Sequence, residues 1–224
     1  MGQRDIDVVV FGATSLTDRH VAAYLAQRAP ELGGLRWAAA ARDGAKAKRV
    51  LAAEGVEPAE MIVAEVGDPS SLNAMASRAT VMLNLVGPYM LYGESVIEAC
   101  VDAGIRRSHR RDSFRPDVGR RVSRFLAQAL PGSGYEPARE RLEPWRWQMS
   151  IRARTSTGRE MRVEINADGH PFYCTTARML AEAGLLLSEA GSTPDRSGCL
   201  TPSTALGTRS AGRFARAGLR FSLA

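Results

Sequence analysis

Four short apolar runs and the stretches between them organise the first hundred or so residues of the chain. Each run is rich in Val, Ile, Leu or Ala, as a strand buried on both faces of a parallel sheet is. The runs lie at residues 6–11, 35–40, 61–64 and 80–86. After each run, apolar residues recur at helical spacing, which predicts a helix. These helices are expected at 17–28, 45–54, from 68 onward and at 93–102.

The starts of these helices carry residues that cap helices well. Thr17 is expected to cap the first helix and Asp68 the third, with Pro69 at the first helical position, where its missing N–H costs nothing. Strands and helices that alternate at such short spacing favour right-handed crossovers. The pattern predicts an α/β fold: a Rossmann-like doubly wound parallel sheet of at least four strands, followed by a small α+β C-terminal region.

Beyond residue 140 the pattern changes. Residues 145–154 and 159–167 flank Ser156-Thr157-Gly158 and predict one hairpin. Because two strands alone are marginally stable, we expect this hairpin to dock on a helix predicted at about 173–190. The apolar side chains of that helix are expected to be core rather than a ligand site; they are Met179, Leu180, Leu185, Leu186 and Leu187.

A ligand of such a sheet binds at the carboxyl ends of the strands. The turn from Gly12 to Thr17 leads into a helix N-terminus, whose free N–H groups and dipole suit a pyrophosphate. The turn is equally what any strand-to-helix connection needs, and only Gly12 survives from a G-x-x-G-x-x-G spacing, with Ser15 and Asp18 at the other two positions. Asp18 would bring negative charge toward an anionic ligand.

Arg42 ends the second strand, where a dinucleotide-binding protein meets the adenosine 2′ position. An arginine there accommodates a 2′-phosphate, so Arg42, with Lys46 nearby, favours NADP over NAD; a solvated surface charge is the alternative. The end of the fourth strand would line the nicotinamide half. The predicted cofactor-binding residues are Gly12, Ala13, Thr14, Ser15, Leu16, Thr17, Arg42, Asn84, Gly87, Pro88 and Tyr89.

Catalytic residues are not identified. Tyr89 and Tyr92 lie nearest the expected nicotinamide end, and a phenol there could donate a proton. The three histidines, His20, His109 and His170, belong to no triad or metal set. No metal site is predicted.

Several motifs resemble one known family. Residues 8–19 (VVVFGATSLTDR) resemble the VFGATGFTGR opening of saccharopine-dehydrogenase-like oxidoreductases, which include the bacterial trans-acting enoyl reductases. Residues 84–94 (NLVGPYMLYGE) resemble their LNxVGPYxxYGE signature, the most specific of the matches. Further similar segments lie at 35–43, 127–141, 168–182 and 198–207, so the resemblance covers about 1–104 and 127–224.

The resemblance implies a nicotinamide-dependent reductase, with NADPH as cofactor, that reduces a lipid- or polyketide-linked double bond. It also implies a small-molecule or lipid-linked substrate, a synthase as partner, and peripheral membrane association. Two alternatives remain open: a catalytically inactive, truncated remnant, and an NADP-sensing module.

The middle of the chain departs from the family. Where members carry a fifth strand resembling THYVDLTGE, residues 105–115 read IRRSHRRDSFR, which is too charged for a buried strand. The resemblance is thus to an internally truncated member, and a frame change in the coding sequence would explain the segment. Three regions follow: 1–104, an NADP-binding Rossmann-like domain; 105–140, an irregular linker; and 141–224, a remnant of the substrate domain.

Composition narrows the function classes. The net charge of +6 comes almost wholly from arginine, and the basic run 106–111 has no interleaved aromatic residue to stack a base, so no nucleic acid is expected as partner. Cys100, Cys174 and Cys199 are isolated, which supports neither zinc nor a disulfide framework. With no apolar stretch of membrane-spanning length and no signal peptide recognised, the expected location is cytoplasmic, with membrane association open.

Overall fold

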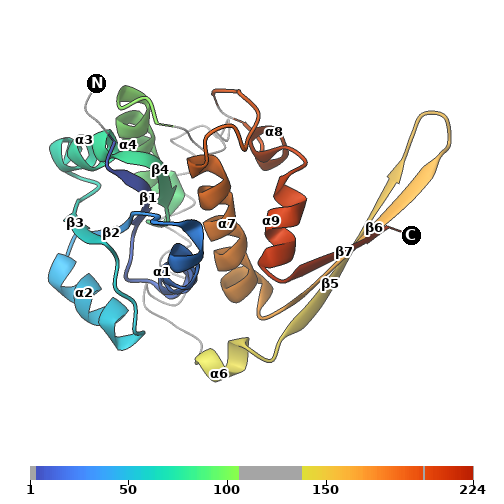
Figure 1. The fold of residues 1–224 in the computed structure, drawn as a ribbon, viewed down its shortest axis with the longest axis horizontal. Coiled ribbons are helices and arrows are strands. Elements are labelled where there is room, and N and C mark those ends of the chain that lie inside the picture. The colour runs from blue at the N-terminus through green and yellow to red at the C-terminus, as the bar shows by residue number, and fades with distance from the viewer. Residues whose placement is uncertain (1–3, 106–137, 199, 224) are drawn as a thin grey trace.

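The computed structural model describes residues 4–105, 138–198 and 200–223. Its larger sheet has four parallel strands in the order β3-β2-β1-β4. These are β1 (Ile6–Phe11), β2 (Trp37–Ala41), β3 (Glu60–Val63) and β4 (Ala79–Asn84). The Rossmann-like α/β fold predicted from the alternation of strands and helices is confirmed (Figure 1).

Helices cover both faces of this sheet. They are α1 (Leu16–Arg28) with a short 3-10 turn η1 (Ala29–Leu32), α2 (Gly44–Ala53), α3 (Pro69–Arg78) and α4 (Tyr89–Asp102). Val21 and Leu25 of α1 share one core cluster with Val8 and Val10 of β1. Residues of α3 and α4 form the second cluster, on the opposite face, with Val9 and Phe11 among others. Alternate residues of β1 thus enter opposite cores, which is why its whole run is apolar.

The C-terminal helix α7 (Thr176–Ser188) belongs to the first of these cores. It lies beside α1 and against β4 and β1 (Figure 1). Small residues, Ala177, Ala181 and Gly184, recur along it. A Cβ added at Gly184 would lie 3.1 Å from the Leu83 side chain, so glycine permits the close approach of helix and sheet. The C-terminal region therefore shares its core with the parallel sheet.

Contacts at the amino end of the parallel sheet show which way α7 runs along it. The guanidinium of Arg4, just before β1, donates to the carbonyls of Ala103 and Gly104, which places the end of α4 there. Leu187, in the last turn of α7, lines one cavity together with Ile105. Because α7 ends at the amino end of the sheet, its first turn and residues 170–175 before it lie toward the carboxyl end, where β1 leads into the Gly12 turn.

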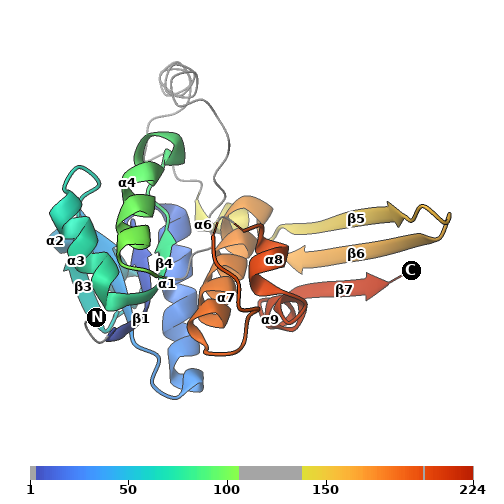
Figure 2. The ribbon, with the colours of Figure 1, turned by 90° about the horizontal axis from the view of Figure 1, so that it is seen from above.

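A second sheet has three antiparallel strands in the order β5-β6-β7. They are β5 (Arg146–Arg154), β6 (Glu160–Asp168) and β7 (Leu219–Leu223). The predicted hairpin is present, but it is joined by a third strand that the sequence analysis did not predict. The hairpin projects beyond the helices (Figures 1 and 2). Short elements complete this region: α6 (Arg139–Leu142), a π-helical turn η2 (Pro171–Thr175), α8 (Pro202–Leu206) and α9 (Ser210–Arg216).

Two predicted helix starts were wrong. Ser15, not Thr17, is the N-cap of α1, because the Asp18 carboxylate reaches back to the Ser15 N–H at 3.1 Å in a capping-box arrangement. The helix α4 begins at Tyr89 after Pro88 rather than at Gly93, which lies inside the helix. Asp68 caps α3 as predicted, accepting from the Ser70 N–H at 3.0 Å. The predicted segments at 105–115 and 127–137 lie outside the described residues, apart from Ile105.

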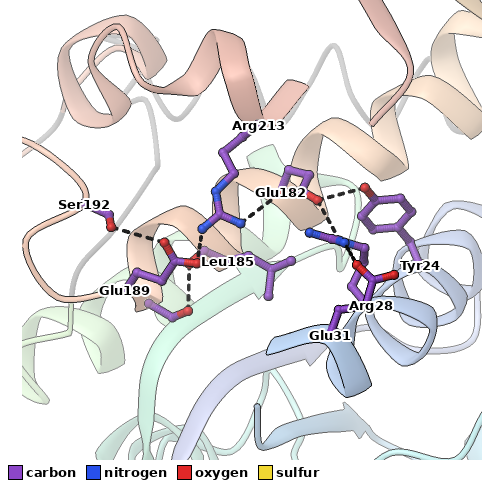
Figure 3. A network of polar contacts seen from close by, with 9 residues as sticks. Tyr24, Arg28, Glu31, Glu182, Leu185, Glu189, Ser192 and Arg213 are labelled. Carbon is purple, nitrogen blue, oxygen red and sulfur yellow. Dashed lines mark hydrogen bonds and ion pairs between the residues drawn. The ribbon is translucent and has the colours of Figure 1, made fainter. Parts of the chain in front are cut away.

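A buried carboxylate joins three helices. Glu182 of α7 is fully buried and accepts hydrogen bonds from the Tyr24 hydroxyl at 2.8 Å and from Nε of Arg28 at 3.2 Å (Figure 3). Arg213 of α9 lies 3.5 Å from its second oxygen and also pairs with Glu189. Burial and the Glu182 carboxylate raise the pKa of the Tyr24 phenol. The cluster fixes α1, α7 and α9 to one another.

A second ion cluster ties the amino ends of two strands. Arg78, the last residue of α3, donates to Asp5 before β1 at 2.6 Å and to Glu60 of β3 at 2.7 Å. The guanidinium holds the pKa of both carboxyls below their usual range. This end of the sheet is thus occupied by structural ion pairs, which leaves the opposite end for a ligand.

Candidate dinucleotide-binding site

The turn after β1 needs its glycine. Gly12 has a φ of +115°, and a Cβ there would lie 3.2 Å from the backbone carbon of Leu85. The Gly12 N–H donates to the Ala40 carbonyl at 2.8 Å, and the Thr14 N–H donates to the Gly12 carbonyl at 2.5 Å. Leu16 and Thr17 then occupy the first two positions of α1, where helix geometry leaves an N–H without an acceptor inside the helix. Such N–H groups are anion donors.

Register brings the predicted residues of three strands to one edge. Phe11 pairs with Ala40 of β2 on one side and with Asn84 of β4 on the other. The Gly12 turn therefore lies between the strand end that carries Arg42 and the one that carries Asn84. The sequence-predicted groups from 12–17, 42 and 84–89 all lie at this carboxyl end of the sheet.

Asn84 presents an unused donor there. Its Oδ1 accepts from the Val86 N–H at 3.1 Å, which fixes the amide. Its Nδ2 is buried and has no hydrogen-bond partner in the part of the chain that the structure describes. A buried amide donor without an acceptor is costly, so a ligand oxygen at this position would be stabilising.

Asp18 is the feature that opposes an anion. Its carboxylate is 2% exposed and lies 3.2 Å from the position of a Gly12 Cβ. It occupies the place of the third glycine of the motif, and its charge is directed into the turn rather than away from it. The sequence analysis identified this charge but not its burial.

Arg42 is in the predicted place but is not engaged in the turn. Its side chain is 79% exposed and its guanidinium lies 3.9 Å from the Glu65 carboxylate. The next residue, Asp43, caps α2 by accepting from the Lys46 N–H at 2.8 Å. Arg42 is thus an exposed cation at the end of β2, paired loosely with the Glu65 carboxylate.

Tyr89 and Tyr92 lie on the first turn of α4 and are 49% and 40% exposed. Partial burial, and after it the charge of Asp18, raise the pKa of the Tyr89 phenol. Like any phenol, it is protonated at neutral pH, and the raised pKa makes it a weaker acid than a tyrosine in water. Tyr89 could therefore hold a proton at this edge of the sheet.

An aromatic cluster lies toward the same end and was not predicted as a group. The His170 ring lies 4.5 Å from that of Trp145, 5.1 Å from Tyr173 and 5.9 Å from Phe172. Nδ1 of His170 accepts from the Phe172 N–H at 3.3 Å. The sequence signal was the run His170-Pro171-Phe172-Tyr173, but the partner Trp145 lies 25 residues earlier and could not be read from it.

Three other features were considered as sites: a cavity, metal-ligating side chains and membrane-spanning helices. A cavity of about 250 Å³ lies at the opposite, amino end, between α4, α7 and residues 193–200, and none of the predicted cofactor residues lines it. Among the described residues no group of His, Cys, Asp and Glu could hold a metal ion. No helix within the described ranges is long and apolar enough to cross a membrane.

The fold and the turn define a Rossmann-type α/β domain. No family model matches the chain. A lipid droplet localized protein of Caenorhabditis elegans is 42% identical over 104 residues, 44% of this chain and 24% of that protein. A saccharopine dehydrogenase-like oxidoreductase of Homo sapiens is 39% identical over 113 residues, 46% of this chain and 26% of that protein.

A Mycobacterium tuberculosis protein named as a trans-acting enoyl reductase is 38% identical over 106 residues, 45% of this chain and 24% of that protein. The resemblance to saccharopine dehydrogenase-like oxidoreductases and to trans-acting enoyl reductases is thus confirmed over somewhat less than half of the chain. The matched stretch spans about a quarter of the length of these relatives.

Solved structures give weaker likenesses. The apo saccharopine dehydrogenase of Saccharomyces cerevisiae has a TM-score of 0.38 and 11% identity, over 83% of this chain and 59% of that one. The Escherichia coli NADPH-dependent quinone oxidoreductase complexed with NADPH has a TM-score of 0.37 and 23% identity, over 55% of this chain and 45% of that one. At TM-scores this low they identify neither a family nor an activity.

Proposed function

We propose that the chain binds NADPH at the Gly12 turn and acts as an oxidoreductase that reduces a lipid- or polyketide-linked double bond. The observation that carries the proposal is the position of the Gly12 turn and the α1 N-terminus between the ends of β2 and β4. The relatives support its chemistry, since they are named as oxidoreductases and as an enoyl reductase, and one as a lipid droplet protein.

Five of the predicted residues have a role in this proposal. The N–H groups of Leu16 and Thr17 hold the pyrophosphate, and Arg42 swings from Glu65 to the 2′-phosphate. The buried Nδ2 of Asn84 donates to a ribose or nicotinamide oxygen. When bound, NADPH would supply a hydride. The Tyr89 phenol holds the proton that reduction of a double bond also requires.

The test is cofactor titration of the whole chain, followed by calorimetry or tryptophan fluorescence. The variant Arg42→Ala should weaken NADPH binding about 10- to 100-fold, the worth of a charge-assisted hydrogen bond, and leave NADH binding unchanged. The control is Lys48→Ala, which removes an equal charge from the exposed face of α2. Equal losses in both variants would assign the effect to net charge, and absence of binding at millimolar NADPH would refute the proposal.

A second candidate is a chain that binds NADPH without turnover, as a sensor or an inactive remnant. It is favoured by the buried Asp18 at the third motif position and by the partial span of the relatives. Stereospecific hydride transfer from labelled NADPH to any enoyl acceptor would exclude it. Binding without transfer would support it. In either case a synthase partner and membrane association remain proposals.

A further inference from the structure

Alternation divides the β5-β6-β7 sheet into two chemically opposite faces. In an antiparallel pair, directly opposed residues share a face, as Met149 and Ile165 do, and Ile165 and Phe221 in turn. Extending this register assigns every residue of one face. That face is apolar throughout and consists of Trp147, Met149, Ile151, Ala153, Met161, Val163, Ile165, Ala167, Leu219, Phe221 and Leu223.

The other face is polar and carries several ion pairs. It consists of Arg146, Gln148, Ser150, Arg152, Arg154, Glu160, Arg162, Glu164, Asn166, Asp168, Arg220 and Ser222. Ion pairs join Arg162 to Glu164 and Arg154 to Glu160, and Asp168 meets both Arg146 and Arg220. Five arginines and three carboxylates make this face polar and suited to water, and Arg152 lies directly opposite Arg162 on it.

The helices cover only the base of the apolar face. Ala167 and Leu219 are buried there with Phe214 of α9 and Met179 of α7. Toward the hairpin tip the same face is open to water. The exposed fractions are 47% for Met149, 46% for Ile151, 45% for Met161, 41% for Phe221 and 80% for Leu223. About half of this continuous apolar surface is therefore left uncovered by the residues that the structure describes.

We propose that a second copy of this chain covers the outer half of the apolar face, which we define as Met149, Ile151, Met161, Phe221 and Leu223. Two copies related by a two-fold axis present the same residues to each other, so the contact is complementary by symmetry. Face-to-face packing about 10 Å apart would bury both apolar faces and leave both charged faces in water. No like charges would meet, because the arginines lie on the outer faces.

The area fits a weak dimer. If a large side chain has about 200 Å² of surface, the outer half exposes about 500 Å² per copy. Two copies would bury about 1,000 Å², the lower bound for a specific interface. Association at micromolar rather than nanomolar concentration is expected from an area of this size.

Sedimentation equilibrium on the whole chain, from about 1 to 100 μM, tests this. The wild type should show a concentration-dependent dimer, and Ile151→Glu should weaken it at least tenfold. The matched control Ser150→Glu places the same charge on the polar face of the same strand and should leave the dimer unchanged. Leu223→Glu repeats the test at a side chain that is 80% exposed and so contributes little burial to the fold.

Three outcomes would overturn the proposal: a wild type that is monomeric at 100 μM, a dimer that survives both Ile151→Glu and Leu223→Glu, or equal weakening by Ser150→Glu. A monomer that binds neutral phosphatidylcholine vesicles through the same residues would assign the face to lipid instead. None of these measurements uses NADPH, so the result stands apart from the proposed function.

Discussion

Asp18 sets the balance of charge at the Gly12 turn. The site offers the anion-binding N–H groups of a helix start, but the Asp18 carboxylate lies against the turn and holds the Ser15 N–H. That N–H is one of the donors a pyrophosphate would otherwise use. The side chain therefore both repels an anion and occupies a donor. It also stabilises α1, as a capping-box residue does, which explains how it can be retained at a site that it weakens.

Removing this charge should strengthen cofactor binding. Asp18→Asn keeps the shape of the side chain and should lower the dissociation constant for NADPH about tenfold, because one close repulsion near the phosphates is lost. The measurement is isothermal titration with NADPH. Asp102→Asn, which removes a carboxylate at the end of α4 at the opposite, amino end of the sheet, is the control and should not change the affinity. Unchanged or weaker binding in Asp18→Asn would show that no phosphate lies near the turn.

At the scale of elements, Glu182 determines how the C-terminal helices attach. The carboxylate is fully buried between Arg28 and Arg213, whose side chains are 14% and 10% exposed. A buried pair of this kind adds little net stability, but breaking it leaves an uncompensated charge in the core. The residue therefore favours this arrangement of α1, α7 and α9 over others.

Glu182→Gln should lower the free energy of unfolding by about 1–3 kcal/mol, because Arg28 and Arg213 lose their buried counter-charge and keep only the more exposed carboxylates of Glu31 and Glu189. Urea unfolding followed by circular dichroism measures this change. In the exposed pair of Arg154 and Glu160, the control Glu160→Gln should cost less than about 1 kcal/mol. If the two variants lose the same amount, the Glu182 cluster is not a structural tie.

The local pattern of apolar residues was sufficient to predict an element where both of its faces are buried. The run Ile6–Phe11 is apolar at every position but one because both faces of β1 are covered, so its sequence alone identifies the strand. The strand Leu219–Leu223 was missed because it is short, mostly exposed and paired with β6, about fifty residues earlier in sequence. The helix α7 was predicted, but its packing against Leu83 was not, because helical spacing does not name the surface that a helix meets.

The same distinction applies to the candidate site. The turn at residues 12–17 could be located because a strand end and a helix start are local signals. Two features could not be predicted, because each depends on residues brought together by the fold: the Asn84 Nδ2, which has no partner among the described residues, and the ring contact of Trp145 with His170. Side-chain direction was also beyond the pattern, as the burial of Asp18 demonstrates.

At the scale of the molecule, the parallel sheet and the C-terminal region share one core. Residues of α7 lie in the same cluster as Val8, Val10 and Leu83, and Glu182 adds a polar tie to α1. Two regions joined by such an interface cannot expose their surfaces separately without unfolding both cores. A chain built from independent domains would instead have a small, polar contact between them.

Unfolding should therefore be one cooperative transition, and the tryptophans allow a direct test. Trp37 is buried in β2, whereas Trp147 lies at the base of the second sheet and donates to Thr175 at 3.1 Å. Chains that retain only Trp37 or only Trp147, with the remaining tryptophans changed to Phe, should each lose their native fluorescence in a single transition. Its denaturant midpoint should equal the midpoint of unfolding of the same variant. Far-ultraviolet circular dichroism of each variant gives the reference midpoint. If Trp147 instead reports a lower midpoint than the circular dichroism of the same variant, the second sheet unfolds alone and the shared core does not couple it to the parallel sheet.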